Sequence, residues 1–171
     1  MTNKDRLIWY VSYGSNLCYR RFLLYIAGGK DEELRVKEDG CNDKTPPRDS
    51  RVITIPYRLY FGNRSGKWDG GGVCFVKTKR DKTSKTIARA YLITYEQYLE
   101  VCEQEGNSPR WYGNQMSLEP IDGIETKTLT SYTDNQRSIP SEAYIDVVKK
   151  GLKECGLTEQ EAIEYIKKHI E

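Results

Sequence analysis

The sequence predicts one α+β domain over residues 1–171, with a mixed, curled or barrel-like sheet and flanking helices. Three observations support this fold class. The 171 residues are enough for one hydrophobic core and too few to expect two. Hydrophobic residues make up 37% and charged residues 30%, as in ordinary globular proteins. Short strand-like stretches and separate helical patterns follow one another without an internal repeat or a linker between domains.

Strands are expected where apolar and β-branched residues gather. They are residues 7–13, 51–61 with a break at Pro56, 73–77, 86–93, about 115–120, and 125–133. Helices are expected where apolar residues recur at helical spacing or where a capping box, Thr94–Gln97 or Thr158–Glu161, opens a helix. They are residues 17–27, ended by Gly28 and Gly29, residues 94–105, ended by Gly106, residues 141–155, and a last helix from 158.

The connections between these elements are polar. Residues 29–50 are charged and rich in turn-forming residues, which predicts the longest irregular connection, folded over the surface or over a pocket mouth. Residues 77–85 are expected to form a solvated loop. Residues 62–72 are rich in glycine but lack the GxGxxG and Walker patterns, so the sequence gives no support for a nucleotide site.

Composition excludes several classes of function. The five cysteines are scattered and form no CxxC pair, which indicates reduced thiols rather than disulfides or a zinc site. The only histidine, His169, lies near the C-terminus, so histidine-dependent hydrolase mechanisms and histidine metal sites are not expected. The net charge of +2 is spread without a basic stripe, which argues against a nucleic-acid partner. No apolar run approaches the ~20 residues of a membrane helix, so we expect a cytoplasmic protein without a membrane partner.

Glu105 is the first residue that points to chemistry. The apolar side of the predicted helix consists of Tyr95, Tyr98, Leu99 and Cys102, and Glu105 continues this stripe three residues later. Burial and the negative end of the helix dipole would both raise the pKa of a carboxyl at this position. Such a carboxyl can transfer protons near neutral pH. The alternative is a helix-end glutamate that turns out into solvent.

The turn Gly14–Asn16 is the second candidate. It leads from the first strand into the first helix, where unpaired backbone N–H groups and the helix dipole favour an anion such as a carboxylate. The alternative is a turn that merely connects the two elements.

Several segments resemble the γ-glutamylcyclotransferase superfamily. Tyr10–Leu17 (YVSYGSNL) resembles the opening motif of the superfamily, and Tyr60–Asn63 with Trp68–Val73 is similar to its second block. Glu103–Gly106 (EQEG) is similar to the block that ends in the catalytic glutamate, and Ser131-Tyr132 is similar to a later strand pair whose tyrosine faces the ligand. The resemblance covers nearly the whole chain, and the long segment 29–50 resembles a bacterial branch.

The resemblance implies a γ-glutamylcyclotransferase-like fold and an enzyme. Glu105 would be the catalytic acid–base residue of a reaction in which the α-amine of a γ-glutamyl compound attacks its own γ-carbonyl, giving 5-oxoproline and an amine. The substrate-binding residues would be Tyr13, Gly14, Ser15, Asn16, Leu17 and Tyr132. No metal or cofactor is implied, and the partner is a small γ-glutamyl molecule. The alternatives are removal of a γ-glutamyl group from a specialised metabolite, and a non-catalytic module that binds an acidic small molecule or peptide.

Overall fold

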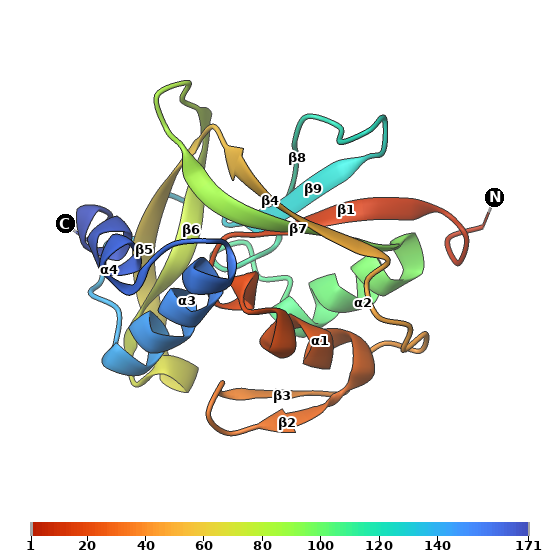
Figure 1. Ribbon diagram of the computed structural model, residues 1–171, viewed down its shortest axis with the longest axis horizontal. Coiled ribbons are helices and arrows are strands. Elements are labelled where there is room, and N and C mark those ends of the chain that lie inside the picture. The colour runs from red at the N-terminus through yellow and green to blue at the C-terminus, as the bar shows by residue number, and fades with distance from the viewer. Residues whose placement is uncertain (1, 171) are drawn as a thin grey trace.

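The largest sheet has five strands in the order β4-β7-β1-β9-β8 (Figure 1). The chain is described by a computed structural model over residues 2–170. The strands of the large sheet are β1 (Leu7–Ser12), β4 (Asp49–Ile55), β7 (Thr86–Thr94), β8 (Asn114–Ser117) and β9 (Thr126–Thr130). Strand β1 pairs antiparallel with β7 and parallel with β9, so the sheet is mixed. This confirms the α+β prediction.

The other described strands form two hairpins. They are β2 (Gly29–Asp31) with β3 (Val36–Glu38), and β5 (Tyr57–Ser65) with β6 (Gly71–Arg80). Pro56 separates β4 from β5, so the predicted strand 51–61 becomes two strands in different sheets. Strand β6 meets β9 through the Thr130 side chain, which donates to the Val76 carbonyl and accepts from the Val76 N–H. Because this contact is not a backbone ladder, the described strands form no closed barrel.

The helices lie on one face of the large sheet and beside the second hairpin. They are α1 (Tyr19–Ala27), α2 (Tyr95–Glu105), α3 (Glu142–Glu154) and α4 (Glu159–Lys168), with short 3₁₀ turns η1 (Ser15–Leu17) and η2 (Gly66–Trp68). Helices α1 and α2 lie together below β1 and β7 in Figure 1, and α3 and α4 lie next to β5 and β6. None of the helices within residues 2–170 is long and apolar enough to cross a membrane.

Aromatic stacking joins the large sheet to α1. The Phe22 ring stacks on Tyr10 of β1 at 5.3 Å and on Tyr91 of β7 at 4.1 Å, measured between ring centroids. All three side chains are buried. Such pairs add to the free energy that the buried area itself supplies. The start of α1, directly after the turn 14–17, is thereby fixed against the centre of the sheet.

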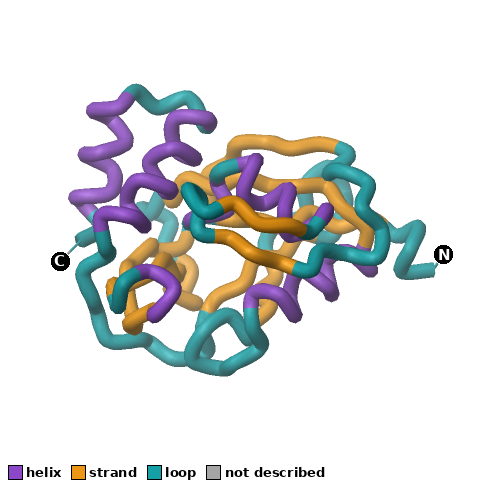
Figure 2. Tube along the Cα trace, turned by 90° about the horizontal axis from the view of Figure 1, so that it is seen from below, coloured by secondary structure: helices purple, strands orange, loops and turns teal. Residues whose placement is uncertain are grey.

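Most element boundaries agree with the sequence expectations, and both capping boxes are present at Thr94 and Thr158. Two connections differ. The segment 29–50 was expected to be irregular, yet it contains the β2–β3 hairpin, which covers α1 in Figures 1 and 2. Lys77–Arg80 belong to β6 rather than to a loop, because the pairing with β5 continues as far as Arg80, opposite Tyr57, while the polar side chains stay exposed or half-exposed.

Gly151 allows α3 to pack directly on the turn η1. A Cβ at this position would lie 2.4 Å from the Leu17 Cβ and 2.7 Å from the Cys18 backbone nitrogen. Real Cβ atoms do not approach other atoms so closely, and backbone atoms cannot move away as a flexible side chain can. The contact therefore places the turn 14–17 against a helix from the far end of the chain.

We expect Gly151→Ala to destabilise the folded chain. The overpacking should lower the free energy of unfolding by about 1–3 kcal/mol and the thermal midpoint by several degrees. Gly66→Ala is the control, because a Cβ there meets no atom within 4 Å and the backbone is not in the left-handed region. Thermal unfolding followed by circular dichroism measures both variants. Equal midpoints for the two variants would contradict the packing role of Gly151.

Candidate functional site

Helix α2 carries Glu105 on its buried face. Tyr98, Val101 and Cys102 are buried, and Glu105 follows Tyr98 by seven residues, so that its side chain continues this face. Leu99, which was expected in the stripe, is 39% exposed instead. The buried face of α2 consists of Gln97, Tyr98, Val101 and Cys102. The Glu105 side chain is nevertheless half-buried and lines a cavity, and its acid–base role stays a prediction.

The turn after β1 faces Glu105 from the other side. Ser15 and Asn16 form the first residues of η1, and their backbone N–H groups have no hydrogen-bond acceptor among residues 2–170. The N–H of Leu17, in contrast, donates to the Gly14 carbonyl at 3.0 Å. Leu17 is fully buried and lines neither cavity described below, so the structure does not bring its side chain to the site. The tight 3₁₀ turn uses the Leu17 N–H in its own hydrogen bond and buries the Leu17 side chain in the core.

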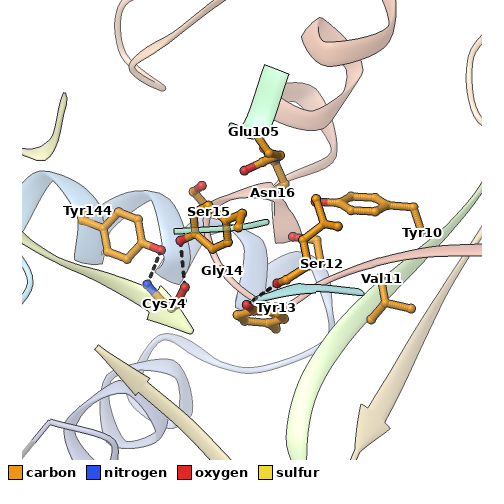
Figure 3. A pocket seen from close by; sticks show the side chains of 12 residues that line it. Tyr10, Val11, Ser12, Tyr13, Gly14, Ser15, Asn16, Cys74, Glu105 and Tyr144 are labelled. Carbon is orange, nitrogen blue, oxygen red and sulfur yellow. Dashed lines mark hydrogen bonds between the residues drawn. The ribbon is translucent and has the colours of Figure 1, made fainter. Parts of the chain in front are cut away.

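A chain of hydrogen bonds connects a buried cation to Glu105. The Asn16 amide donates from Nδ2 to Glu105 Oε1 at 2.9 Å, as Figure 3 shows for their adjacent side chains. The Arg21 guanidinium donates to the Asn16 Oδ1 at 2.7 Å, and also to the carbonyls of Leu34 and Arg35. Since a guanidinium can only donate, Arg21 fixes the orientation of the amide, with its NH₂ group towards the carboxylate.

Two cavities meet at Glu105. The inner cavity, of about 40 Å³, is the one drawn in Figure 3, and the outer cavity has a volume of about 220 Å³. Both are lined by Ser15, Glu105, Tyr112 and Tyr144. The inner cavity adds residues 10–14 and Asn16 together with Cys74 and Leu129. The outer cavity adds, among others, Arg21, Tyr25, Lys67, Trp68, Ser108 and Trp111.

The tyrosines at the inner cavity are fixed by hydrogen bonds. The Tyr13 hydroxyl donates to the Leu129 carbonyl at 2.6 Å, and the Tyr112 hydroxyl donates to the Cys74 carbonyl at 2.8 Å. The Tyr144 hydroxyl accepts from the Cys74 N–H at 2.9 Å. Tyr13 and Tyr112 therefore have no hydroxyl hydrogen left to donate to a ligand. They shape the cavity wall.

The surroundings of Glu105 favour its protonated form. Burial raises the pKa of the Glu105 carboxyl above its ordinary value, and this outweighs the nearby Arg21 and Lys67 charges, which lower it. The Tyr25 hydroxyl also lowers the pKa by hydrogen bonding. Burial, and after it the charge of Glu105, raises the pKa values of Tyr10 and Tyr25. The carboxyl can consequently hold and release a proton closer to neutral pH than an exposed glutamate can.

Tyr132 does not join the site. It is 65% exposed and lies by a different hollow, between β6 and the segment after β9. Strand β9 ends at Thr130, two residues before Tyr132, and the expected contact of Tyr132 with the ligand stays a prediction without support from this placement. Tyr13, Gly14, Ser15 and Asn16, in contrast, line the inner cavity together with Glu105.

Sequence reasoning missed the residues that reach the site from other elements. They are Arg21, Tyr25, Lys67, Cys74, Tyr112 and Tyr144. Arg21 carried a recognisable signal, because it lies four residues before Tyr25 and next to Phe22 on the apolar side of its helix. A charge in that position needs a buried polar partner.

The two long connections contribute differently to the site. The segment 106–111 lines the outer cavity with Gly106, Ser108 and Trp111, whereas the segment 29–50 lines neither cavity.

Metal-binding clusters and the single histidine have no part in this site. Within residues 2–170, no group of three or more His, Cys, Asp or Glu side chains is placed to hold a metal ion. His169 lies at the end of α4, where its Nδ1 is 2.8 Å from the Tyr165 carbonyl oxygen. The groups available for chemistry are the Glu105 carboxyl and the open N–H groups of the turn.

The chain is similar in sequence to a curated plant protein. No protein-family model matches the chain. Histone deacetylase 5 of Arabidopsis thaliana is 32% identical over 202 residues, which are 95% of this chain and 31% of that protein. The chain thus spans about a third of the length of this relative, whose name describes the longer protein. The assignment to a bacterial branch stays a prediction.

Solved structures match nearly the whole chain. An uncharacterized protein from Homo sapiens has a TM-score of 0.64 at 22% identity, covering 98% of this chain and 89% of that chain. A γ-glutamyl cyclotransferase has a TM-score of 0.63 at 21% identity, with coverage of 97% and 89%. YkqA from Bacillus subtilis has a TM-score of 0.61 at 18% identity, with coverage of 97% and 55%. The chain therefore has the fold of γ-glutamyl cyclotransferase.

Proposed function

We propose that the chain is a cyclotransferase that converts a γ-glutamyl amino acid or amine into 5-oxoproline and a free amine. The observation that carries this proposal is the position of the Glu105 carboxyl. It lies on the wall shared by two cavities, with a raised pKa, and faces a turn that has open backbone N–H groups. The fold of the chain is that of an enzyme named for this reaction.

The reaction needs a folded substrate and a proton carrier, but no nucleophile from the protein. The α-amine nitrogen forms a bond to the γ-carbonyl carbon, and the bond from that carbon to the leaving nitrogen breaks. Holding both groups in one small cavity supplies the proximity on which such a cyclisation depends. The inner cavity, at about 40 Å³, is the smaller of the two cavities that meet at Glu105.

Glu105 would move the proton. The carboxylate takes one proton from the α-ammonium group, and the amine that this frees attacks the carbonyl and gives up a second proton to solvent as the ring closes. Glu105, as the acid, delivers its proton to the leaving nitrogen as the C–N bond breaks, and the released amine takes up the second proton from solvent, so that charge and atoms balance. Asn16 holds one carboxylate oxygen in place by its hydrogen bond. The N–H groups of Ser15 and Asn16 would stabilise negative charge on the substrate, either on its α-carboxylate or on the carbonyl oxygen under attack. Tyr13 and Gly14 would form the wall of this subsite.

We expect Glu105→Gln to abolish most of the turnover. Glutamine keeps the shape but cannot accept the ammonium proton, so kcat should fall roughly 10²–10⁴-fold. Glu103→Gln is the matched control, because it makes the same change on an exposed position of the same helix. The measurement is 5-oxoproline formation from a panel of γ-glutamyl amino acids and amines. Full activity of Glu105→Gln would end the acid–base assignment. A wild-type protein that binds γ-glutamyl compounds but does not turn them over would favour a binding module.

The stability of the folded chain should depend on pH through Glu105. Because burial raises the pKa of this carboxyl in the folded state above its ordinary value of 4.5, its stabilising contribution is fully present below pH 4.5. That contribution is lost as the pH rises through the folded-state pKa. The thermal midpoint of Glu105→Gln minus that of the wild type should therefore be near zero at about pH 4 and increase towards pH 7. A difference that does not change with pH would contradict the buried, raised-pKa carboxyl.

The cavity thiol should be dispensable. Cys74 lines the inner cavity, but burial raises its pKa to about 12, so it is protonated and a poor nucleophile at neutral pH. We expect Cys74→Ala to retain turnover within a few-fold of the wild type, and the other four cysteines to be equally dispensable. Loss of 5-oxoproline formation by Cys74→Ala, with an unchanged thermal midpoint, would instead indicate a thiol mechanism.

A further inference from the structure

A third cavity opens beside the outer cavity and is lined by arginines. It has a volume of about 370 Å³, and its lining includes Arg64, Arg110 and Arg137 and no acidic residue of the described chain. Ser108 and Trp111 line both this cavity and the outer cavity. We call it the arginine pocket. Because the two cavities have Ser108 and Trp111 in common, they lie side by side.

The frame of the arginine pocket is held by backbone contacts at a β-bulge. The pairing of β5 with β6 shifts register between Gly62 and Ser65, and Asn63 adopts a left-handed backbone with φ of 56°. Asparagine tolerates this conformation better than most residues. The Asn63 N–H donates to the Gln136 carbonyl at 3.0 Å, and its side chain donates to the Arg110 carbonyl at 2.8 Å. The bulge thus ties together the segments that carry all three arginines.

The Arg110 carbonyl has a second donor, the Asn135 side chain, at 2.9 Å. Arg137 is fixed as well: it pairs with Asp134 at 2.9 Å and its guanidinium lies 3.8 Å from the centre of the Tyr60 ring. The backbone at Arg110 and the side chain of Arg137 are therefore held in place. Bulges and strained residues of this kind often mark functional positions.

Two of the three cations lack a counter-ion. Within residues 2–170, Arg64 and Arg110 form no ion pair, whereas most other arginines of the chain do. The three arginines that line this hollow carry like charges that repel one another, and only the charge of Arg137 is paired, with Asp134. An anion in the hollow would relieve the repulsion, and the planar guanidinium matches a carboxylate or phosphate through paired hydrogen bonds.

We propose that the arginine pocket binds an anionic group at the far end of the substrate's leaving group. This inference rests on the proposed function and specifies its substrate class. The γ-glutamyl end would occupy the inner cavity at Glu105, the first part of the leaving amine would occupy the outer cavity, and a carboxylate or phosphate several bonds further on would meet Arg64 and Arg110.

The test compares substrates that differ only in the terminal charge. The first pair is γ-glutamyl-alanyl-glycine and its C-terminal amide, and the second is γ-glutamyl-phosphoethanolamine and γ-glutamyl-ethanolamine. We expect the anionic member of one pair to have a kcat/KM roughly tenfold higher, mainly through KM, as for a hydrogen bond to a charged group. The pair with the larger ratio identifies carboxylate or phosphate, and the ratio should shrink at high salt.

Variants locate the effect. In the double variant Arg64→Ala/Arg110→Ala, the ratio between anionic and neutral substrate should fall close to one, and Arg110→Lys should restore part of it. Arg80→Ala is the control: Arg80 is an exposed arginine at the far end of β6 that lines none of the three cavities, so the ratio should not change.

The outcomes separate this inference from the proposed function. Equal turnover of both members of each pair would overturn the anion site and leave the cyclotransferase intact. If no γ-glutamyl compound gives 5-oxoproline, the proposed function fails, and calorimetric binding of the same pairs then decides the arginine pocket. Tighter binding of an anionic member that is lost in Arg64→Ala/Arg110→Ala supports the pocket, and equal dissociation constants overturn it.

Discussion

The hydrogen bond from Asn16 to Glu105 is the contact on which the candidate site depends. It joins the end of the first strand to the end of α2, across 89 positions of the sequence. An amide can offer either oxygen or nitrogen, and only the nitrogen attracts a carboxylate. Arg21 makes this choice, because it donates to the amide oxygen and leaves the NH₂ group for Glu105. The buried cation thus acts on the carboxyl in two ways, by its charge and by orienting the amide between them.

The sheet places both partners of this hydrogen bond. Strand β1 lies between β7 and β9, and the turn that follows it is held by Tyr91 of β7, whose hydroxyl donates to the Asn16 carbonyl at 2.7 Å. Strand β7 also leads directly into α2 through the Thr94 capping box. One strand therefore fixes the turn by a side chain and starts the helix that carries Glu105.

Local patterns predicted the parts of the site that local geometry decides. Glu105 follows the buried face of its own helix, and the capping boxes depend on residues three positions apart, so both could be inferred from the sequence. Arg21 could have been suspected as a charge on an apolar helix face. Tyr112 and Tyr144 could not, because their contacts with Cys74 join residues 38 and 70 positions apart. Tyr132 was expected on a strand that ends two residues earlier, so a local pattern placed it beyond the end of the actual strand.

The charged residues that line the three cavities are arranged so that they favour one orientation of a ligand. Glu105 is the only acidic residue that lines the inner or the outer cavity within the described chain. Arg21 lies close to it, but its donors are occupied by Asn16 and by two carbonyls, so it is not free to bind an incoming anion. The cations with exposed side chains lie further out, first Lys67 and then the arginine pocket. A molecule with an ammonium group at one end and an anion at the other is therefore attracted in one orientation, with its ammonium group towards Glu105, before any contact specific to its shape is made.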